Sequence, residues 1–373
     1  MDDEIEAFRD QVRRYIATAL APNLEGWRRQ GFIPREIWRP FGELGFLLPE
    51  LGEDYGGGGA SLAHQLVVQD EMAKAELPAT TGVHTIAAHY ILDYGTEQQK
   101  RRWLRKLASG EMLAGIALTE PGCGSDLKAL RTSARRVDQE WVINGAKTFI
   151  TNGFTANLLI VAVRTGDSGS RGVSLLVVET ENLAGFRVGR RLEKLGQHAS
   201  DTAELFFDNV KIPANHLLGG AEGHGFHQLM SQLPYERLLL AVPAAAVIER
   251  AVELTVDYCK QRKAFGQPVA AFQNTRFKLA ECATIAHIVR SFVNDCTQRL
   301  LDGTLDDESA YMAKWWCSEQ QGKVTDECLQ LFGGYGYMVE YPIARLYADS
   351  RVQRIYGGTT EIMKDLIARK LLD

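Results

Sequence analysis

The chain lacks any hydrophobic run long enough to cross a membrane. Its longest apolar stretches, such as Leu238–Ile248, are shorter than the roughly 20 residues that a spanning helix needs. An excess of basic residues is also missing, because 42 Lys and Arg stand against 47 Asp and Glu, for a formal net charge of −5. Such a mildly acidic chain is not expected to have nucleic acid or an anionic membrane as its main partner.

Cysteine and histidine are sparse and scattered. The six cysteines show no C-x-x-C spacing, and the nearest pair of histidines, His224 and His227, lies in a glycine-rich segment. This pattern predicts buried free thiols in a reducing compartment and a solvated loop, with no metal site. The opening residues Met1–Glu4 are acidic, whereas signal and transit peptides are basic, which favours a cytoplasmic location.

The composition is that of a globular protein of the α+β class. With 373 residues, 45% of them hydrophobic and 24% charged, the chain has apolar material for two or three domains. Residues 1–112 are predicted to form an N-terminal helical domain, because apolar side chains recur there at helical spacing, as in Glu4–Leu20. We expect a central β domain over 113–218 and a C-terminal helical bundle over 219–373.

The central segment alternates short β-branched runs with turn residues. Trp141–Ile143 is followed by Asn144-Gly145, a dipeptide typical of two-residue hairpin turns. No helical pattern of any length lies between the runs, so we expect an antiparallel barrel or sandwich rather than a parallel α/β sheet. Beyond it, long periodic stretches such as Glu236–Lys260 and Phe272–Leu301 predict the helices of the bundle.

Five segments have compositions that packing alone does not require. In Leu118–Asp126, small residues let backbone N–H groups approach a flat or anionic ligand, although a plain turn is an equal reading. Lys147–Gly153 carries an aromatic residue between hydroxyls, as in a cofactor wall or a simple alternating strand. Gln261–Gly266 suits phosphate recognition or a cationic helix end. Gln330–Tyr337 and Ile355–Glu361 suit ligand contact or helix caps.

Taken in order, these segments resemble the acyl-CoA dehydrogenase family. The matching motifs are T-E-P-G-x-G-S-D, R-K-A-F-G, Q-L-F-G-G-Y-G-Y and I-Y-G-G-T-T-E-I, and the resemblance covers essentially the whole chain. It implies an N-terminal helical domain, a central β domain and a C-terminal four-helix bundle, assembled as a homotetramer. It further implies FAD as cofactor, an acyl-CoA substrate of fatty-acid β-oxidation and electron-transfer flavoprotein as the electron acceptor.

The resemblance also assigns roles to individual residues. It implies FAD contacts at Leu118, Thr119, Gly124, Ser125, Phe149, Thr151, Arg262, Phe265, Gln273, Gln330, Gly333, Gly334, Thr359 and Glu361. It implies substrate contacts at Ser125, Tyr235, Arg237, Gly357 and Gly358. Arg262 and Gln273 would reach the cofactor of a partner subunit, and many relatives carry Trp at the position of Phe149.

The catalytic base is expected at Glu236. Medium- and short-chain members of the family place a glutamate directly after the tyrosine of I-Y-E-G-T, where this chain has Gly357. A second subgroup, with the long-chain and isovaleryl-type enzymes, carries its base on a bundle helix in an E-R-L context, which here is Glu236-Arg237-Leu238. The resemblance implies that Glu236 removes the Cα proton while flavin N5 takes the Cβ hydride, giving a trans-2-enoyl-CoA. A glutamate restored at Gly357 is expected to face the same Cα.

Three alternatives stay open at this point. The same fold also serves flavin oxidases and monooxygenases that use oxygen. A related desaturation takes an acyl group carried on a protein instead of on CoA. A flavin-free member retained as a scaffold is the third, against which the intact motifs and Glu236 weigh.

Overall fold

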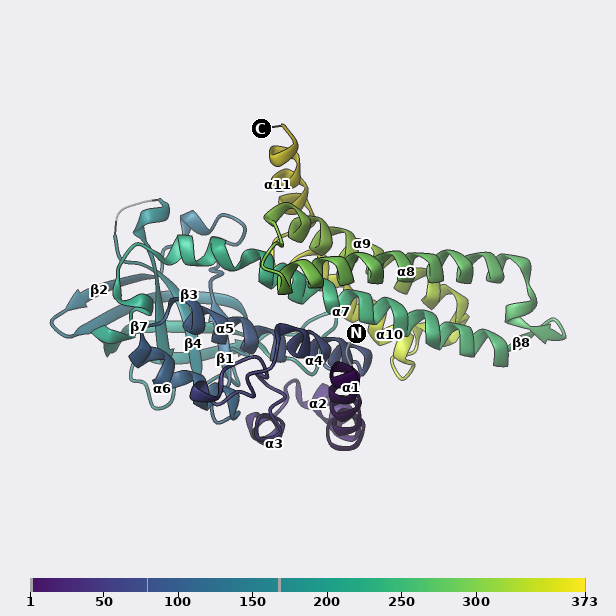
Figure 1. Ribbon diagram of the computed structural model, residues 1–373, viewed down its shortest axis with the longest axis horizontal. Helices are drawn as coiled ribbons and strands as arrows, with labels where there is room; N and C mark the ends of the chain where they lie inside the picture. The colour runs from purple at the N-terminus through teal and green to yellow at the C-terminus, as the bar shows by residue number, and fades with distance from the viewer. Residues whose placement is uncertain (1–2, 79, 167–168, 373) are drawn as a thin grey trace.

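The chain folds as helices, then a sheet, then helices again. The computed structural model describes residues 3–78, 80–166 and 169–372. Figure 1 shows the sheet at one end of the molecule, the long helices of the bundle extending from it towards the other end, and the last helix projecting from the side. The predicted α–β–α order is confirmed. Within the described ranges, no helix combines the length and apolar character that a membrane crossing requires.

Six α-helices form the first part of the chain over the residues that the structure describes. They are α1 (Asp3–Tyr15), α2 (Leu24–Gln30), α3 (Trp38–Glu43), α4 (Leu62–Lys74), α5 (Thr80–Tyr94) and α6 (Glu97–Ala108). Helix α6 begins with a capping box, in which Thr96 Oγ1 accepts from the Gln99 amide at 3.3 Å and Gln99 Oε1 accepts from the Thr96 amide at 3.0 Å. Such a reciprocal pair satisfies two otherwise unpaired N–H groups at the start of the helix.

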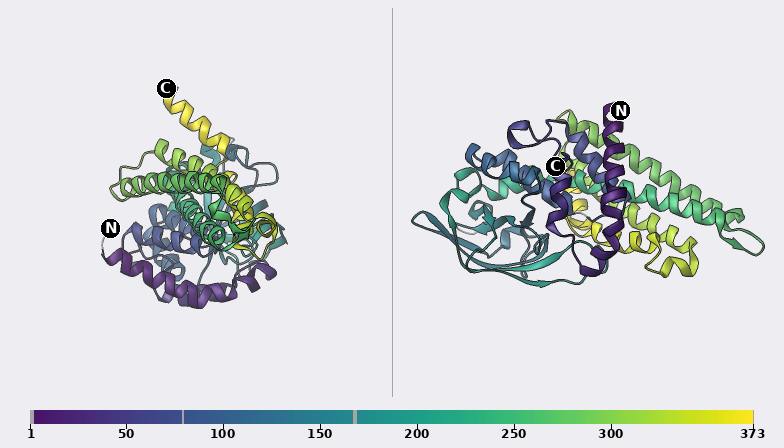
Figure 2. Two further views of the ribbon diagram at one scale, coloured as in Figure 1. Left: turned by 90° about the vertical axis from the view of Figure 1, so that its right-hand side faces the viewer. Right: turned by 90° about the horizontal axis from the view of Figure 1, so that it is seen from below.

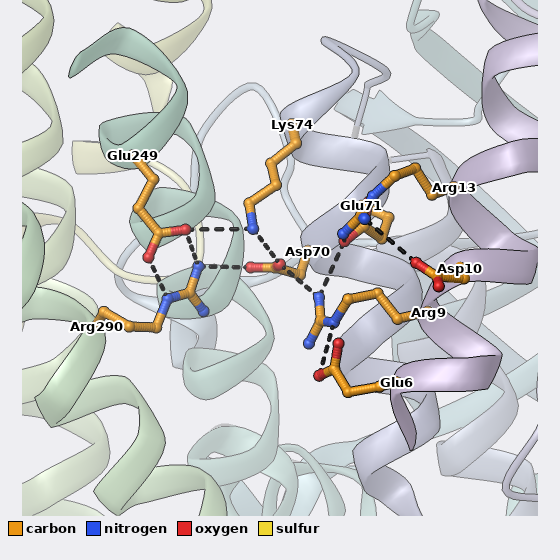
Figure 3. A network of polar contacts seen from close by, with 9 residues as sticks. All are labelled: Glu6, Arg9, Asp10, Arg13, Asp70, Glu71, Lys74, Glu249 and Arg290. Atoms are coloured by element: carbon orange, nitrogen blue, oxygen red, sulfur yellow. Dashed lines mark hydrogen bonds and ion pairs between the residues drawn. The ribbon is translucent and has the colours of Figure 1, made fainter. Parts of the chain in front are cut away.

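Helix α4 is buried on almost every side, including its charged residues. Asp70 accepts hydrogen bonds from Arg9 of α1 at 2.9 Å and from Arg290 at 2.7 Å, and Glu71 accepts one from Arg13 at 2.9 Å. Figure 3 shows these ion pairs joining three layers of helices. Burial alone would raise the pKa of Asp70, but the nearby cations, led by Arg290, hold it below its usual value.

Among the described residues, seven strands form one sheet, with two parallel pairings among antiparallel ones. The strands are β1 (Ala114–Ala117), β2 (Ser133–Val137), β3 (Glu140–Thr151), β4 (Leu158–Arg164), β5 (Val173–Glu179), β6 (Phe186–Arg191) and β7 (Thr202–Pro213). Their order is β1-β4-β2-β3-β7-β6, with β5 on β4. Four pairings are antiparallel, as expected, whereas β4 runs parallel to β2 and to β1, which the sequence did not indicate. The β2–β3 hairpin lies between β1 and β4 in sequence and provides the long connection that a parallel return requires.

The hairpin turn expected at Asn144-Gly145 is not there. Those two residues lie inside β3, and the turn falls at Asp138-Gln139, where Asp138 has φ +53°. Gly145 is needed for another reason, because a Cβ at this position would stand 2.5 Å from Thr132 Oγ1. The dipeptide therefore marks a close approach of two segments rather than a turn.

The last part is the helical bundle. It consists of α7 (Gly225–Gln261), α8 (Gln273–Leu301), α9 (Asp307–Leu331), α10 (Pro342–Ser350) and α11 (Thr360–Leu372), with a small hairpin of β8 (Lys263–Ala264) and β9 (Gln267–Pro268) between α7 and α8. Figure 2 shows the long helices running side by side away from the sheet. Helix α10 was not predicted from the sequence, although Pro342 at its first turn and the apolar spacing of Ile343 and Leu346 are helix signals.

His84 ties the N-terminal helices to the sheet. The side chain is fully buried on α5, its Nδ1 accepts from the Ala114 amide at 3.1 Å, and its Nε2 lies 3.1 Å from the Leu107 carbonyl oxygen. A neutral ring with its proton on Nε2 satisfies both partners. Burial lowers the pKa of His84 to about 4, because a charged ring there would lose its hydration.

We therefore expect stability to fall as the pH falls from neutrality. In the unfolded chain His84 takes up a proton near its ordinary pKa of 6.5, whereas the folded chain takes it up only near pH 4. The neutral His84 ring contributes its full stabilisation above the pKa that it has in the unfolded chain. We expect the free energy of unfolding to fall by about 2 kcal/mol by about pH 5. Urea unfolding across this pH range measures it. His84→Gln should flatten the pH dependence, and the exposed His227→Gln should not; equal slopes in all three proteins would contradict the assignment.

Candidate active site

A partly open cavity brings together residues from all three parts of the chain. Its volume is about 240 Å³, and apolar side chains of α4, α5 and α7, among them Met72, Val83 and Leu239, form much of its wall. Six residues selected from the sequence line it, namely Leu118, Thr119, Phe149, Thr151, Glu236 and Gly357. These residues are far apart in the sequence, so the fold places them around one space.

Glu236 is the carboxylate of this cavity. It lies on α7, half-buried, and opens on the cavity rather than on bulk water. The hydroxyl of Tyr90 donates to Glu236 Oε1 at 2.6 Å. Burial raises the pKa of Glu236 above its usual value, and the Tyr90 hydrogen bond and the charge of Arg237 offset only part of the rise. A carboxylate made more basic in this way suits proton abstraction near neutral pH.

The segment facing Glu236 requires glycine. Gly357 and Gly358 have φ of +63° and +91°, a region that favours glycine. A Cβ at Gly357 would stand 2.2 Å from Leu240 Cδ1. The Gly358 carbonyl accepts a hydrogen bond from the buried Lys314 ammonium, whose pKa burial and the nearby Arg237 lower to about 8. Within the described chain the Gly357 amide donates no hydrogen bond, so it remains available to a ligand oxygen.

Phe149 reaches the cavity because β3 bulges there. The register of β3 against β7 shifts between Lys147 and Ile150, and Phe149 lies on that bulge with φ +58°. Its side chain is 67% exposed in this chain and forms part of the cavity wall. A β-bulge re-aims a side chain in this manner, and positive φ at a bulky residue is a strain that functional sites often retain.

A buried ion pair, which sequence analysis missed, fixes the loop after β1. Lys147 Nζ donates to Glu120 Oε1 at 2.8 Å and to the Leu118 carbonyl at 3.1 Å. Glu120 also accepts from the amides of Arg131 at 2.7 Å and Thr132 at 2.9 Å. Burial alone would raise the pKa of Glu120, but these donors, led by Lys147, lower it. A lysine at an inward position of an alternating strand was the signal available in the sequence.

Three glutamines provide unpaired acceptors on the cavity wall. Gln197, Gln321 and Gln353 line it, and each has a buried side-chain oxygen without a hydrogen-bond partner among the residues that the structure describes. Buried polar atoms in native proteins are nearly always paired. A ligand with N–H or O–H donors would satisfy these oxygens, and the sequence carried no local signal for any of them.

Other predicted cofactor residues gather in a second, separate groove. Arg262, Gly333 and Gly334 line it, and the Arg262 guanidinium lies 5.5 Å from the centroid of the Tyr335 ring. Phe265, on the turn of the β8–β9 hairpin, is 96% exposed. Figure 1 places this hairpin at the end of the bundle farthest from the sheet. The predicted cofactor contacts of one chain therefore fall in two places.

The remaining predicted residues line neither space. They are Gly124, Ser125, Tyr235, Arg237, Gln273, Gln330, Gly358, Thr359 and Glu361. The Tyr235 ring packs 4.4 Å from His89, and the Arg237 guanidinium lies 4.2 Å from the Tyr311 ring centroid. Thr359 Oγ1 accepts from the Ile362 amide at 3.3 Å at the start of α11. In this chain, Tyr235, Arg237 and Thr359 thus have contacts within the protein.

Comparisons with known proteins agree along the whole chain. Models of the acyl-CoA dehydrogenase N-terminal, middle and C-terminal domains match residues 2–111, 115–210 and 223–372. The mitochondrial long-chain specific acyl-CoA dehydrogenase of Mus musculus is 45% identical over 374 residues, which cover 99% of this chain and 86% of the mouse protein.

Solved structures agree as well. The crystal structure of an acyl-CoA dehydrogenase from Geobacillus kaustophilus is 45% identical, with a TM-score of 0.97 over 100% of this chain and 98% of that one. A glutaryl-CoA dehydrogenase from Mycobacterium smegmatis, in complex with FADH2, is 29% identical, with a TM-score of 0.92 over 100% of this chain and 95% of that one.

The buried pair beneath the site predicts a large loss of stability. We expect Lys147→Met to lower the free energy of unfolding by about 3–5 kcal/mol, because Glu120 would keep its charge without its cation. Adding Glu120→Gln to Lys147→Met should restore part of the lost stability, since a neutral amide needs no counter-ion. Lys211→Met is the control, because Lys211 pairs with Glu140 at 3.5 Å on the surface and should cost about 1 kcal/mol or less. Equal losses in urea unfolding for the two single variants would contradict this expectation.

Proposed function

Because the chain belongs to the acyl-CoA dehydrogenase family and is an oxidoreductase that acts on CH–CH bonds of acyl-CoA thioesters, we propose that Glu236 is its catalytic base. In this proposal Glu236 removes the Cα proton, a hydride leaves Cβ, and the product is a trans-2-enoyl-CoA. The observation that carries it is the position of Glu236, a carboxylate of raised pKa on the wall of an apolar cavity. The free Gly357 amide nearby supports it.

The cavity fits FAD as the cofactor. Phe149 offers an exposed aromatic face, and the unpaired oxygens of Gln321 and Gln353 offer acceptors to the N–H of a flavin ring. A relative at 29% identity has been solved with FADH2. When bound, FAD supplies the acceptor for the hydride and later releases the electrons. In our proposal, electron-transfer flavoprotein receives them.

The residues of this chain make the Cα–H removable. The Gly357 amide would donate to the thioester oxygen, where negative charge develops as the proton leaves. Lys314, bonded to the Gly358 carbonyl, holds that segment in place. The apolar side chains around Glu236 would exclude water once a substrate fills the cavity, which would leave the carboxylate with less of its hydration shell. The proton would be taken by Glu236 Oε2, which accepts no hydrogen bond within the described ranges.

The second groove supports assembly as a homotetramer. Arg262, Gly333 and Gly334 line this groove and not the cavity that contains Glu236, and the β8–β9 hairpin that follows Arg262 lies at the end of the bundle farthest from the sheet (Figure 1). An arginine beside aromatic side chains suits a phosphate and a planar base. We propose that this groove, with Gln273 and Gln330, holds the adenosine-diphosphate end of the FAD bound to a neighbouring subunit.

Replacement of the base provides the direct test. We expect Glu236→Gln to retain its flavin and bind acyl-CoA, but to lose turnover by about 10²–10⁴-fold, because an amide cannot accept the proton. Glu253→Gln, at an exposed glutamate on the same helix, is the matched control. Anaerobic flavin absorbance measures the reaction as saturated acyl-CoAs of graded length and branching are added. Bleaching of the flavin at the wild-type rate in Glu236→Gln would show that Glu236 is not the catalytic base.

The same base predicts the pH dependence. Only the ionised carboxylate accepts a proton, so the rate should rise with pH through the pKa of Glu236, which burial places above the usual 4.5.

The flavin-absorbance assay also distinguishes an acyl-CoA substrate from an acyl group that is carried on a protein. In the latter case acyl-CoAs would fail to bleach the flavin, while an acyl group on a carrier protein would succeed.

Moving the base to position 357 should need a second change. In Glu236→Gln, Gly357→Glu alone should restore no turnover, because its Cβ would meet Leu240 and φ of +63° disfavours a side chain by about 1–3 kcal/mol. Adding Leu240→Ala should restore part of the activity. The Glu236→Gln/Leu240→Ala protein controls for loss of the leucine alone. Full recovery without the Leu240 change would contradict the steric argument.

A further inference from the structure

Glu236 has a single hydrogen-bond partner among the described residues, and it comes from a different helix. The Tyr90 hydroxyl of α5 donates to Oε1 at 2.6 Å, while Oε2 accepts no hydrogen bond. Tyr90 is 1% exposed, so water does not compete for this bond. A hydrogen bond to an ionised group in such surroundings is among the stronger ones in proteins.

We propose that Tyr90 is a positioning residue, which orients the Glu236 carboxylate so that Oε2 takes the Cα proton of the substrate. This rests on the proposed function, in which Glu236 is the base. An unrestrained carboxylate presents either oxygen and rotates about its terminal torsion, which is broad. With Oε1 bound to Tyr90, one oxygen and one orientation remain for the substrate, as a positioned base requires.

The surroundings of Tyr90 hold it in place. On α5, the neighbouring His89 packs its ring 4.4 Å from Tyr235, and His89 Nε2 lies 2.8 Å from Glu50 Oε1. Two consecutive residues of α5 therefore contact two consecutive residues of α7. The base is fixed by contacts between two helices, so its position does not depend on a loop.

The hydroxyl also affects how readily Glu236 holds a proton. Burial, together with the Glu236 charge, raises the pKa of Tyr90 well above its usual value, so Tyr90 stays a donor throughout the working range. Its hydrogen bond favours the ionised form of Glu236. The other titratable groups around the carboxylate and its cavity are Tyr94 on α5, Tyr235 and Arg237 on α7, and Glu76, Asp349 and Tyr356 on the cavity wall.

The test compares Tyr90→Phe with Tyr94→Phe in the full-length protein. Tyr94 lies one turn along α5, its ring centroid 6.3 Å from that of Tyr90, and it does not bond to Glu236. For Tyr90→Phe we expect the acid limb of kcat to move up by about one pH unit or more, and kcat at neutral pH to fall about tenfold. KM for acyl-CoA should change little. Tyr94→Phe should match the wild type.

A second measurement does not depend on turnover. The infrared C=O stretch of the protonated Glu236 carboxyl, identified by its loss in Glu236→Gln, can be titrated without substrate. In Tyr90→Phe the Glu236 carboxyl should titrate at higher pH than in the wild type. The free energy of unfolding in urea should change only slightly. Wild-type profiles in both measurements, or equal shifts in Tyr90→Phe and Tyr94→Phe, would overturn the role of Tyr90. Wild-type turnover in Glu236→Gln would instead show that Glu236 is not the base, and the proposed role of Tyr90 would then be wrong as well.

Discussion

The need to pair buried carboxylates determines much of this structure. Asp70 and Glu71 lie on α4, a helix enclosed by its neighbours, and each is bonded to arginines from other helices (Figure 3). Removing one partner of such a pair typically costs about 3–5 kcal/mol, because the remaining charge stays buried. Helix α4 is therefore held in a single position between α1 and α8. Since Met72 of the same helix lines the cavity, these distant ion pairs also fix the shape of the site.

Different donors give these buried carboxylates different chemistry. Arg290 and Lys74 beside Asp70, and Lys147 beside Glu120, overcome the effect of burial and lower both pKa values. Among the described residues, Glu236 has only a neutral hydroxyl within hydrogen-bond distance, and its pKa is raised. Asp70 and Glu120 are thus locked as anions that hold structure together, whereas Glu236 can exchange a proton. Whether a buried carboxylate has a lowered or a raised pKa here depends on the charge of its hydrogen-bond donor, not on burial alone.

Features that neighbouring residues encode can be predicted from the sequence, whereas those that depend on distant contacts cannot. The start of α6 follows from Thr96 and Gln99, three residues apart. The E-R-L motif likewise predicts Glu236 as the base from adjacent residues. By contrast, Asn144-Gly145 has the composition of a turn, yet its glycine is required by Thr132 from another segment. The Tyr90–Glu236 bond joins residues 146 positions apart, and no local pattern indicates which of the chain's tyrosines makes it.

The position of the base and the glycine at 357 are linked by packing. Leu240 follows Glu236 by four residues, so both side chains project from the same face of α7. Glu236 reaches the cavity, and Leu240 fills the space where a side chain at 357 would begin, 2.2 Å from its Cδ1. A side chain at 357 would therefore need Leu240 to move, in addition to the strain of its positive φ. Gly357 lines the same cavity, and its amide donates no hydrogen bond among the described residues, so in the function proposed above one face of α7 would supply the base and the segment at 357 would bind the thioester oxygen.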